Sequence, residues 1–292
     1  MKRITLFMAV CLSALACTQK TEVQLIDAAS FDGEVDGKKV ALYTLQEADL
    51  TMQVTNFGAR VVSLWTPDKA GNQEDIVLGY NNLDNYVNNP GERFLGAVVG
   101  PYANRIAKGT YTIGEETYNF PQNNNGQTLH GGLKGLDMVV WDVESVNDST
   151  LVLSCLHADG QEGMPGNLKI VMTYALSSDN EFKVDYVADT DKPTHMNISH
   201  HSFFNLKGEG NGTINDHVLF INASATTPVD SVLIPTGEIA DVTGTPFDFR
   251  TAKKVGQDIE AEEEQLTLVS GYDHNWVLDG AEGTLREIAT VS

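Results

Sequence analysis

The sequence predicts an all-β protein, a large antiparallel β-sandwich or barrel. Three observations favour this fold class. Apolar and polar residues alternate in several short segments, which is the pattern of a strand with one buried face. The chain has 26 glycines and asparagine-rich turns, whereas good helix candidates are few. Its 292 residues, of which 41% are hydrophobic, are enough to bury one large core.

The strand-like segments follow one another along the whole chain. They are, in order, 50–55, 168–174, 182–186, 218–223 and 276–278. Ser178-Asp179-Asn180 separates the second segment from the third, which predicts a β-hairpin. The best helix candidate is 252–265, whose glutamates are expected to form a solvated face. Cys155 lies in the strand-like run LVLSCL, where we expect a small buried residue.

The N-terminus has the pattern of an export signal. Met1-Lys2-Arg3 is basic, residues 4–16 are apolar, and Ala14-Leu15-Ala16 is a small-residue cleavage site. The apolar run is too short to span a bilayer. Cys17 follows the cleavage site directly, as in bacterial lipoprotein signals, although Ala14 stands where such signals usually carry leucine.

These features divide the chain into three parts. We expect a lipoprotein-type signal segment over 1–17, a tether over 18–39 and the folded domain over 40–292. The protein is then exported to the cell envelope or periplasm and anchored to the membrane by a lipid on Cys17. The alternative is a soluble exported protein in which this cysteine is incidental.

Charge and cysteine content narrow the class of partner. The formal charge is −21, with 19 basic and 40 acidic residues, so the surface repels nucleic acid and anionic lipid. A neutral small molecule fits this charge better than nucleic acid or anionic lipid does.

Cys11 would leave with the signal and Cys17 would be lipidated, which leaves Cys155 alone and excludes an intramolecular disulfide. The sequence has no zinc-binding spacing and no phosphate-binding glycine motif.

The segment NISHHSFFNL contains two adjacent histidines, His200 and His201. Neighbouring residues of a strand point to opposite faces. In a regular strand over 195–206, the face of His200 also carries Met196 and Phe204 and is largely apolar, whereas the face of His201 is polar. Strand parity therefore predicts a core position for His200 and a cleft position for His201, unless a β-bulge intervenes.

Three further segments place polar side chains where a structural element would rarely need them. GPYANRI carries Arg105, TLHGG carries His130, and GYDHNW carries Asp273 beside a histidine and two aromatic residues. Taken singly, each has an ordinary explanation as a surface arginine, a turn histidine and an Asx-turn aspartate. Together they have the composition of a sugar site, where aromatic faces stack on C–H surfaces and polar groups fix hydroxyls.

The chain resembles the aldose 1-epimerase family, also called galactose mutarotases, from about Ala41 to its last residue. The motifs that carry the resemblance occur in order: GPYANRIAKG, TLHGG, DGQEGMPGNL, NISHHSFFNL, IPTGEI, TPFDFR and GYDHNW. The resemblance implies a galactose mutarotase-like supersandwich, a large β-sandwich with its site on a concave sheet face.

The resemblance also implies an activity, the interconversion of the α and β anomers of a free aldose. Ring opening requires a proton delivered to the ring oxygen and another removed from the anomeric hydroxyl, so a positioned acid and base suit it. The reaction needs no redox cofactor, and we expect no metal in the site; the sequence leaves open whether a calcium ion is bound. We expect a monomer whose partner is a small aldose.

The family's site residues can be carried over position by position. His201 takes the place of the proton donor to the ring oxygen. The expected substrate-binding residues are Asn104, Arg105, His130, Ser202, Phe203 and Asp273. His200 replaces a residue that is often asparagine in the family, so we assign it no catalytic role.

One expected residue has no counterpart. The family's general base is a glutamate well beyond the GYDHN motif, and the chain stops at 288–292, inside a strand-like run. Glu282 and Glu287 do not match that motif. We expect a domain truncated at its C-terminus, because an end within a strand leaves an unpaired sheet edge. As it stands, the chain is then expected to be catalytically impaired.

Three functions compete. The first is a mutarotase for free hexoses such as glucose or galactose. The second is a non-catalytic carbohydrate-binding protein on the same fold, supported by the missing base. The third, a phosphosugar epimerase, would need additional cations near the sugar, which a formal charge of −21 does not favour.

Overall fold

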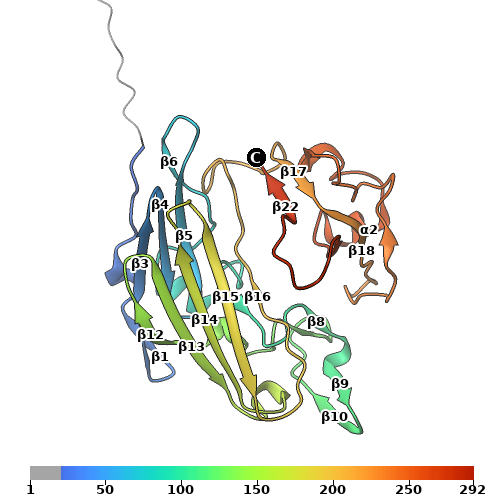
Figure 1. Cartoon of the computed structure of the whole chain (residues 1–292). Helices are drawn as coiled ribbons and strands as arrows, with labels where there is room; N and C mark the ends of the chain where they lie inside the picture. The colour runs from blue at the N-terminus through green and yellow to red at the C-terminus, as the bar shows by residue number, and fades with distance from the viewer. Residues whose placement is uncertain (1–20) are drawn as a thin grey trace, which may run out of the picture.

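Two four-stranded antiparallel sheets form the body of the protein (Figure 1). The computed structural model describes residues 21–292, so the expected signal segment and Cys17 lie outside the described residues. The first sheet has the order β3–β4–β5–β6, formed by Leu42–Glu47, Leu50–Thr55, Arg60–Pro67 and Gln73–Asp75. The second has the order β12–β13–β14–β15, formed by Asp142–Val146, Thr150–His157, Leu168–Leu176 and Phe182–Thr190. The predicted antiparallel β-sandwich is therefore confirmed.

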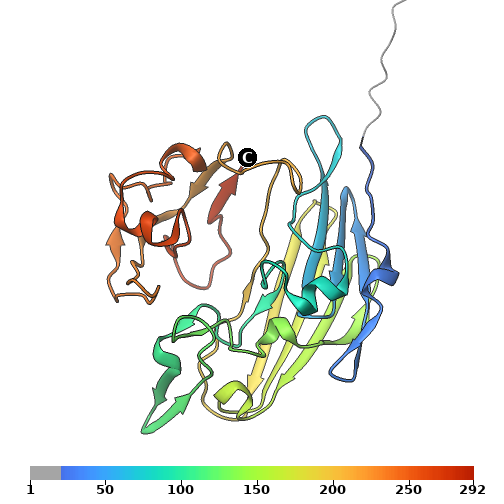
Figure 2. The same ribbon diagram turned by 180° about the vertical axis from the view of Figure 1, so that it is seen from behind.

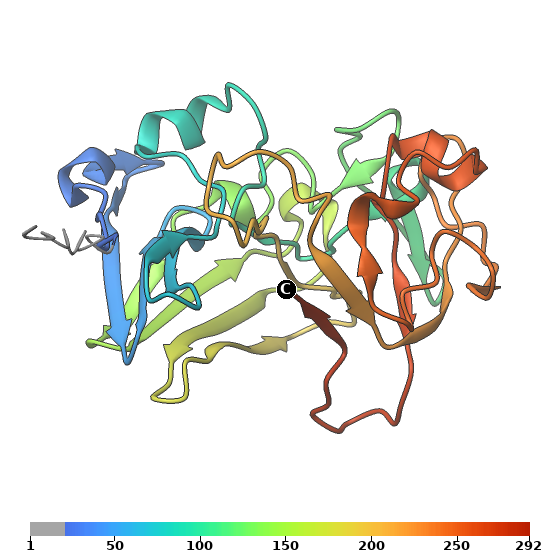
Figure 3. The same cartoon turned by 90° about the horizontal axis from the view of Figure 1, so that it is seen from above.

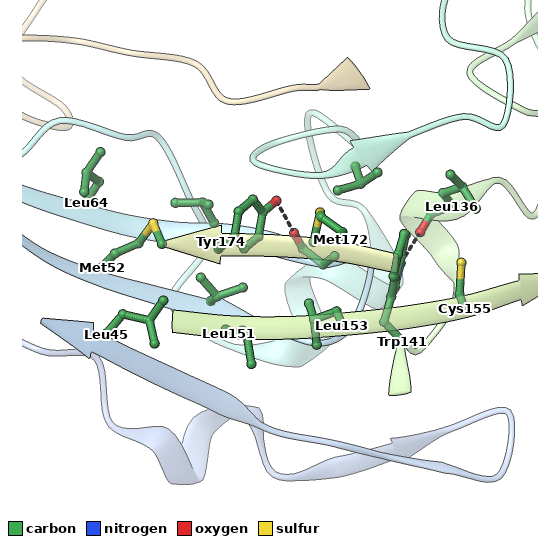
Figure 4. Packing of buried hydrophobic residues seen from close by; sticks show 14 of the residues in the cluster. Leu45, Met52, Leu64, Leu136, Trp141, Leu151, Leu153, Cys155, Met172 and Tyr174 are labelled. Atoms are coloured by element: carbon green, nitrogen blue, oxygen red, sulfur yellow. Dashed lines mark hydrogen bonds between the residues drawn. The ribbon is translucent and has the colours of Figure 1, made fainter. Parts of the chain in front are cut away.

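The main core lies between these sheets (Figure 4). Leu45 and Met52 from the first sheet belong to one cluster with Leu153 and Met172 from the second, and burying each such side chain contributes about 1.5–3 kcal/mol. Tyr174 is also fully buried, and its hydroxyl donates a hydrogen bond to the Ala59 carbonyl at 2.8 Å.

The sequence patterns explain β14 and β15. Alternate residues of β14 are buried, and β14 pairs with β15 from Leu168 opposite Thr190 to Leu176 opposite Phe182. The predicted hairpin is confirmed. Cys155 is buried on β13, as expected.

The expected tether over 18–39 is wrong for its described residues. The Thr21 carbonyl accepts a hydrogen bond from the Gln73 amide of β6 at 3.0 Å. The Gln53 side chain donates to the Ile26 carbonyl at 3.0 Å and accepts from the Ile26 amide at 2.9 Å. Phe31, in the 3₁₀-helix η1 (Ala28–Phe31), is fully buried. This segment covers the outer face of β4, so both faces of β4 are buried rather than the single face that its alternation predicts.

Four two-stranded antiparallel sheets complete this part of the molecule. They are β1 (Gly33–Val35) with β2 (Lys38–Val40), β7 (Val98–Val99) with β16 (Ser199–His200), β8 (Arg105–Ile106) with β11 (Thr128–Leu129), and β9 (Thr110–Ile113) with β10 (Glu116–Asn119). The remaining short helices are α1 (Leu83–Asn88), η2 (Ala107–Gly109), η3 (Leu136–Met138) and η4 (Gln161–Gly163).

The C-terminal part forms a smaller unit beside the sandwich, orange to red in Figures 1, 2 and 3. One sheet places β17 (Val218–Ile221) between β20 (Lys253–Lys254) and β22 (Ala289–Val291), and another places β18 (Ala223–Thr226) between β19 (Ala240–Asp241) and β21 (Trp276–Leu278). Val242, Phe247 and Leu266 form its own buried cluster.

The helix expected over 252–265 differs from the observed structure. Lys253 and Lys254 pair with β17, and Val255–Gln257 form the 3₁₀-helix η5. Helix α2 (Glu264–Val269) begins only after Glu263, whose side chain accepts a hydrogen bond from the Leu266 amide. Pairing with β17 takes the place of the first helical turns. No helix of residues 21–292 is long and apolar enough to cross a membrane.

Candidate active site

Two imidazole rings meet beside the β7–β16 pair. The His201 amide donates to the Ala97 carbonyl at 2.8 Å, which fixes its backbone immediately after β16. The rings of His130 and His201 have centroids 5.1 Å apart and are nearly perpendicular, at 85°. Residues separated by 71 positions in the sequence thus form one group.

The loop around His130 determines which ring nitrogen can donate. Its backbone is left-handed (φ 53°), its amide donates to the Asn104 carbonyl at 3.0 Å, and its Nδ1 accepts from the Asn104 amide at 3.0 Å. Burial lowers the pKa of His130 to about 3, and the charges of His201, Arg105 and Arg93 act in the same direction. The ring is therefore neutral near pH 7, and its proton lies on Nε2, which can donate to a ligand.

Arg105 and Asp273 approach each other from the two parts of the molecule. The guanidinium donates to the side-chain oxygens of Asn124 and Asn104, each at 3.2 Å. Burial lowers the pKa of Arg105 from its ordinary value, while the Asp273 charge opposes that shift. Arginine nevertheless remains charged in proteins. The two residues line one pocket, with a volume of about 40 Å³, together with Asn104, His274 and Asn275.

The carboxylate of Asp273 is available for a ligand. Asp273 is exposed, and its backbone amide donates to His274 Nδ1 at 3.2 Å. Among the residues that the structure describes, no donor reaches the carboxylate oxygens. A charged acceptor thus faces a charged donor across a small pocket, an arrangement that can hold adjacent hydroxyls of a sugar.

His200 and His201 occupy different surroundings, as strand parity predicts. The ring of His200 packs against Tyr174 and Phe182 of the main core, with both centroids 5.7 Å away. Burial, and secondarily the charge of His201, lowers the pKa of His200 to about 4. His201 packs instead against His130 and Phe203.

The regular strand expected over 195–206 is nevertheless wrong. Only Ser199 and His200 form a strand; Met196 and Phe204, expected in the core, are 47% and 43% exposed. Parity is lost on both sides of β16, because the chain pairs elsewhere there: the Asn197 amide donates to the Pro101 carbonyl at 2.8 Å, and the Phe203 carbonyl accepts from the Leu78 amide at 3.0 Å.

The structure brings together most of the expected site residues. Phe203 is 38% exposed, and its ring lies 5.1 Å from that of His201, so it forms one wall of the site. Ser202 does not join them, since its hydroxyl lies 3.4 Å from Nε2 of His200, on the core side. The group at the site is therefore His130, His201, Asn104, Arg105 and Phe203, with Asp273 facing Arg105.

Two aromatic residues of the GYDHNW motif have a structural role instead. The Tyr272 hydroxyl donates to the Pro246 carbonyl at 3.0 Å, and Trp276 Nε1 donates to the Phe247 carbonyl at 3.1 Å. Both rings pack on the small C-terminal cluster. The expectation that they provide sugar-stacking surfaces is not supported by these contacts.

Sequence reasoning missed Phe94. The centroid of its ring lies 4.6 Å from that of His130 and 5.7 Å from that of His201, so Phe94 packs against both imidazoles. The sequence feature that could have indicated it is an aromatic residue in ERFLG, a segment that ends four residues before the GPYANRI motif begins. As for metals, no group of three or more His, Cys, Asp or Glu side chains within 21–292 is arranged to hold an ion.

Together, the fold and the site define a β-sandwich protein with paired histidines and polar groups suited to a polyhydroxylated small molecule. A family model described as aldose 1-epimerase matches residues 41–291, and the chain belongs to this family. The predicted family resemblance is thereby confirmed.

Relatives and solved structures agree with this assignment. A galactose mutarotase from Bos taurus is 40% identical over 243 residues, covering 83% of this chain and 68% of the relative. An aldose 1-epimerase from Escherichia coli K12 is 35% identical over 255 residues, covering 87% and 72%. The crystal structure of a galactose 1-epimerase from Lactobacillus acidophilus NCFM superimposes with a TM-score of 0.77 at 31% identity, covering 89% of this chain and 75% of that one.

Proposed function

We propose that this protein is an aldose 1-epimerase that interconverts the α and β anomers of a free hexose such as glucose or galactose. The observation that carries the proposal is the packing of His201 against His130, with ring centroids 5.1 Å apart, beside Arg105. Family membership and the names of the relatives, galactose mutarotase and aldose 1-epimerase, support the same reaction.

The chemistry follows from these side chains. His201 delivers a proton to the ring oxygen, the anomeric hydroxyl gives its proton to a base or to a water molecule, and the bond between C1 and the ring oxygen breaks to give the open-chain aldehyde. Rotation about C1–C2 and reversal of the steps gives the other anomer. Histidine suits the acid role because its charge changes near neutral pH.

The other residues hold the sugar. His130 donates from Nε2, while Arg105 donates to hydroxyl oxygens and Asp273 accepts from hydroxyl protons. Asn104 orients Arg105 through the bond between its side-chain oxygen and the guanidinium. Phe203 offers an exposed ring for the C–H surface of the sugar. We assign the base role to no carboxylate of this chain; Glu282 and Glu287 are both exposed in the segment before β22.

Polarimetry of freshly dissolved α-glucose tests the proposal. In a full-length version of the protein, the change in rotation is expected to run faster than its spontaneous rate, and His201→Asn is expected to lower the enzymatic rate by about 10²–10⁴-fold, because asparagine cannot deliver a proton. A wild-type protein that binds glucose without accelerating the change would instead support a carbohydrate-binding role.

We further propose that the protein acts as a monomer in the cell envelope, anchored by a lipid on Cys17. The basic start, the apolar run and the cysteine after the cleavage site support this localisation. Cys17→Ser is expected to move the protein from the membrane fraction to the soluble exported fraction. Unchanged membrane association of this variant would contradict the lipid anchor, and recovery of the native protein in the cytoplasm would contradict export.

A further inference from the structure

A buried charged cluster holds the segment of Phe94, the ring that packs against both histidines. It consists of Arg60, Asp137 and Arg93, of which Arg60 and Asp137 are fully buried. Arg60 donates from Nη1 to the carbonyls of Arg93 at 2.8 Å and Leu95 at 3.0 Å, and from Nη2 to the Asp137 carbonyl at 2.9 Å. The first two acceptors flank Phe94, so one guanidinium holds the backbone on both sides of this ring.

Arg93 connects the same segment to the loop of His130. Its Nε and Nη2 donate to the two oxygens of the Asp137 carboxylate at 2.7 and 3.0 Å, and Nη2 also donates to the Leu133 carbonyl at 3.1 Å. Leu133 lies three residues after His130. The Arg93 guanidinium also lies 5.0 Å from the centre of the Phe94 ring, within the range of a cation–π contact.

The buried charges around Phe94 call for an explanation other than stability. A buried ion pair seldom stabilises a fold more than apolar side chains of the same volume would, so we ask what this ion pair positions. Gly96, two residues later, has a left-handed backbone (φ 65°), and a Cβ atom there would lie 2.0 Å from the Val61 carbonyl oxygen. The segment 93–96 thus has little room to shift, and it presents one aromatic ring to both imidazoles.

We propose that Phe94 is a positioning residue of the active site and that Arg60, Asp137 and Arg93 form the clamp that holds it. This inference rests on the proposed function. Phe94 sets the separation and tilt of His130 and His201, so that one ring delivers a proton while the other hydrogen-bonds the sugar. Such placement matters because a displacement of about 1 Å can cost about 10²-fold in rate.

The clamp also places a positive charge, that of Arg93, near His130. The charged or titratable groups that act on His130 are His201, Arg105 and Arg93. All three disfavour a proton on His130 when they carry positive charge. Arg93 therefore helps to keep His130 neutral, with its Nδ1 accepting from Asn104 and its Nε2 proton directed away from that bond.

Phe94→Leu tests the positioning role, because it removes the ring and keeps an apolar side chain. We expect kcat for mutarotation to fall at least about tenfold, with KM changed less than about twofold. Phe204→Leu, the same substitution at an exposed phenylalanine outside the site, is the matched control and should keep wild-type kcat. Wild-type kcat in Phe94→Leu would overturn the proposal.

Arg93→Gln and Arg93→Lys test the clamp. Lysine keeps the charge but not the two-pronged bond to Asp137, whereas glutamine loses both. In ¹⁵N NMR titrations of the histidine rings without sugar, Arg93→Gln should raise the pKa of His130, and Arg93→Lys should raise it less. Identical ring signals in both variants and the wild type would overturn the clamp. Because this measurement needs no turnover, it decides the clamp even if the wild-type protein proves inactive and the proposed function fails.

Discussion

At the scale of single residues, the adjacent histidines show how far local pattern reaches. Alternation along a strand is enough to send His200 and His201 to opposite sides, because His200 is the last residue of β16 and His201 follows it directly. The same rule fails for Phe204, since the neighbouring Phe203 carbonyl bonds to the Leu78 amide, which lies outside β7 and β16. The alternation of apolar and polar residues therefore predicts which face a side chain takes only over residues that pair with one and the same strand.

His200→Asn is predicted to separate stability from activity. The ring packs against Tyr174 and Phe182, so its loss should lower the free energy of unfolding by about 1–3 kcal/mol. Mutarotation should remain close to wild type, because this ring faces the core. Thermal melts beside polarimetry make the comparison. An inactive His200→Asn variant with an unchanged melting temperature would reverse the assignment of the two rings.

Asp273→Ala is predicted to weaken productive sugar binding. Losing a charged hydrogen-bond partner costs about 1.5–3 kcal/mol, so kcat/KM should fall about 10- to 150-fold. Steady-state kinetics with α-glucose measures the change, and Asp179→Ala serves as a control at an exposed carboxylate in the turn between β14 and β15. Normal kcat/KM in Asp273→Ala would remove this carboxylate from the site.

At the scale of elements, the loop that carries His130 depends on its glycines. Gly131 has a left-handed backbone (φ 88°), and a Cβ atom at this position would lie 2.0 Å from the Gly100 carbonyl oxygen. The loop and the segment before Pro101 therefore approach each other backbone to backbone. This close approach places His130 beside the β7–β16 pair.

Gly131→Ala is predicted to be strongly destabilising, by more than the roughly 1–2 kcal/mol of left-handed strain alone. Gly114→Ala is the matched control: Gly114 also has a left-handed backbone (φ 61°), but a Cβ atom there would meet no other atom within 4 Å, so only the strain should appear. Urea unfolding of both variants gives the difference. Equal losses of stability would show that the close approach to Gly100 relaxes at no cost.

Elements were predictable where they depend on nearby residues. The β14–β15 hairpin combines strict alternation with a turn, and both signals lie within one stretch of sequence. Helix α2 was misplaced because pairing of Lys253–Lys254 with β17, about 35 residues earlier, overrides a helix-like composition. Phe94 escaped notice for the same reason, since its position depends on Arg60 and Asp137, which are distant in sequence.

At the scale of the whole molecule, buried histidines couple stability to pH. Burial lowers the pKa of His130 to about 3 and those of His157 and His200 to about 4. The unfolded chain, with histidine pKa values near 6.5, therefore binds more protons than the folded one between about pH 4 and 6.5. Stability should be complete above about pH 6.5 and decline as the pH falls towards 4.

His157→Leu is predicted to reduce this acid sensitivity. The ring is 2% exposed, and neither of its nitrogens has a hydrogen-bond partner among the described residues. Each such histidine contributes a slope of up to about 1.4 kcal/mol per pH unit. Burial raises the pKa of Asp75 to about 6 and also raises that of Asp137, so these two carboxyls have the opposite slope, but the three buried histidines outnumber them. Urea unfolding at about pH 5 and 7.5 should show a smaller difference in His157→Leu than in wild type or in the exposed control His195→Leu; equal differences would contradict the assignment.

If Cys17 carries the proposed lipid, the hydrogen bond from the Gln73 amide to the Thr21 carbonyl limits the distance between the folded domain and the membrane. Only four residue steps separate Thr21 from the proposed lipid attachment at Cys17. A fully extended chain spans at most about 3.6 Å per residue, so the segment 17–21 reaches about 14 Å. That length is close to the distance of about 10 Å over which exposed charges interact at 0.1 M salt. Without Lys2 and Arg3, which would leave with the signal, the formal charge changes from −21 to −23. The lipid would hold such a protein at the membrane while an anionic bilayer repels it, so at low ionic strength the connecting segment would be stretched.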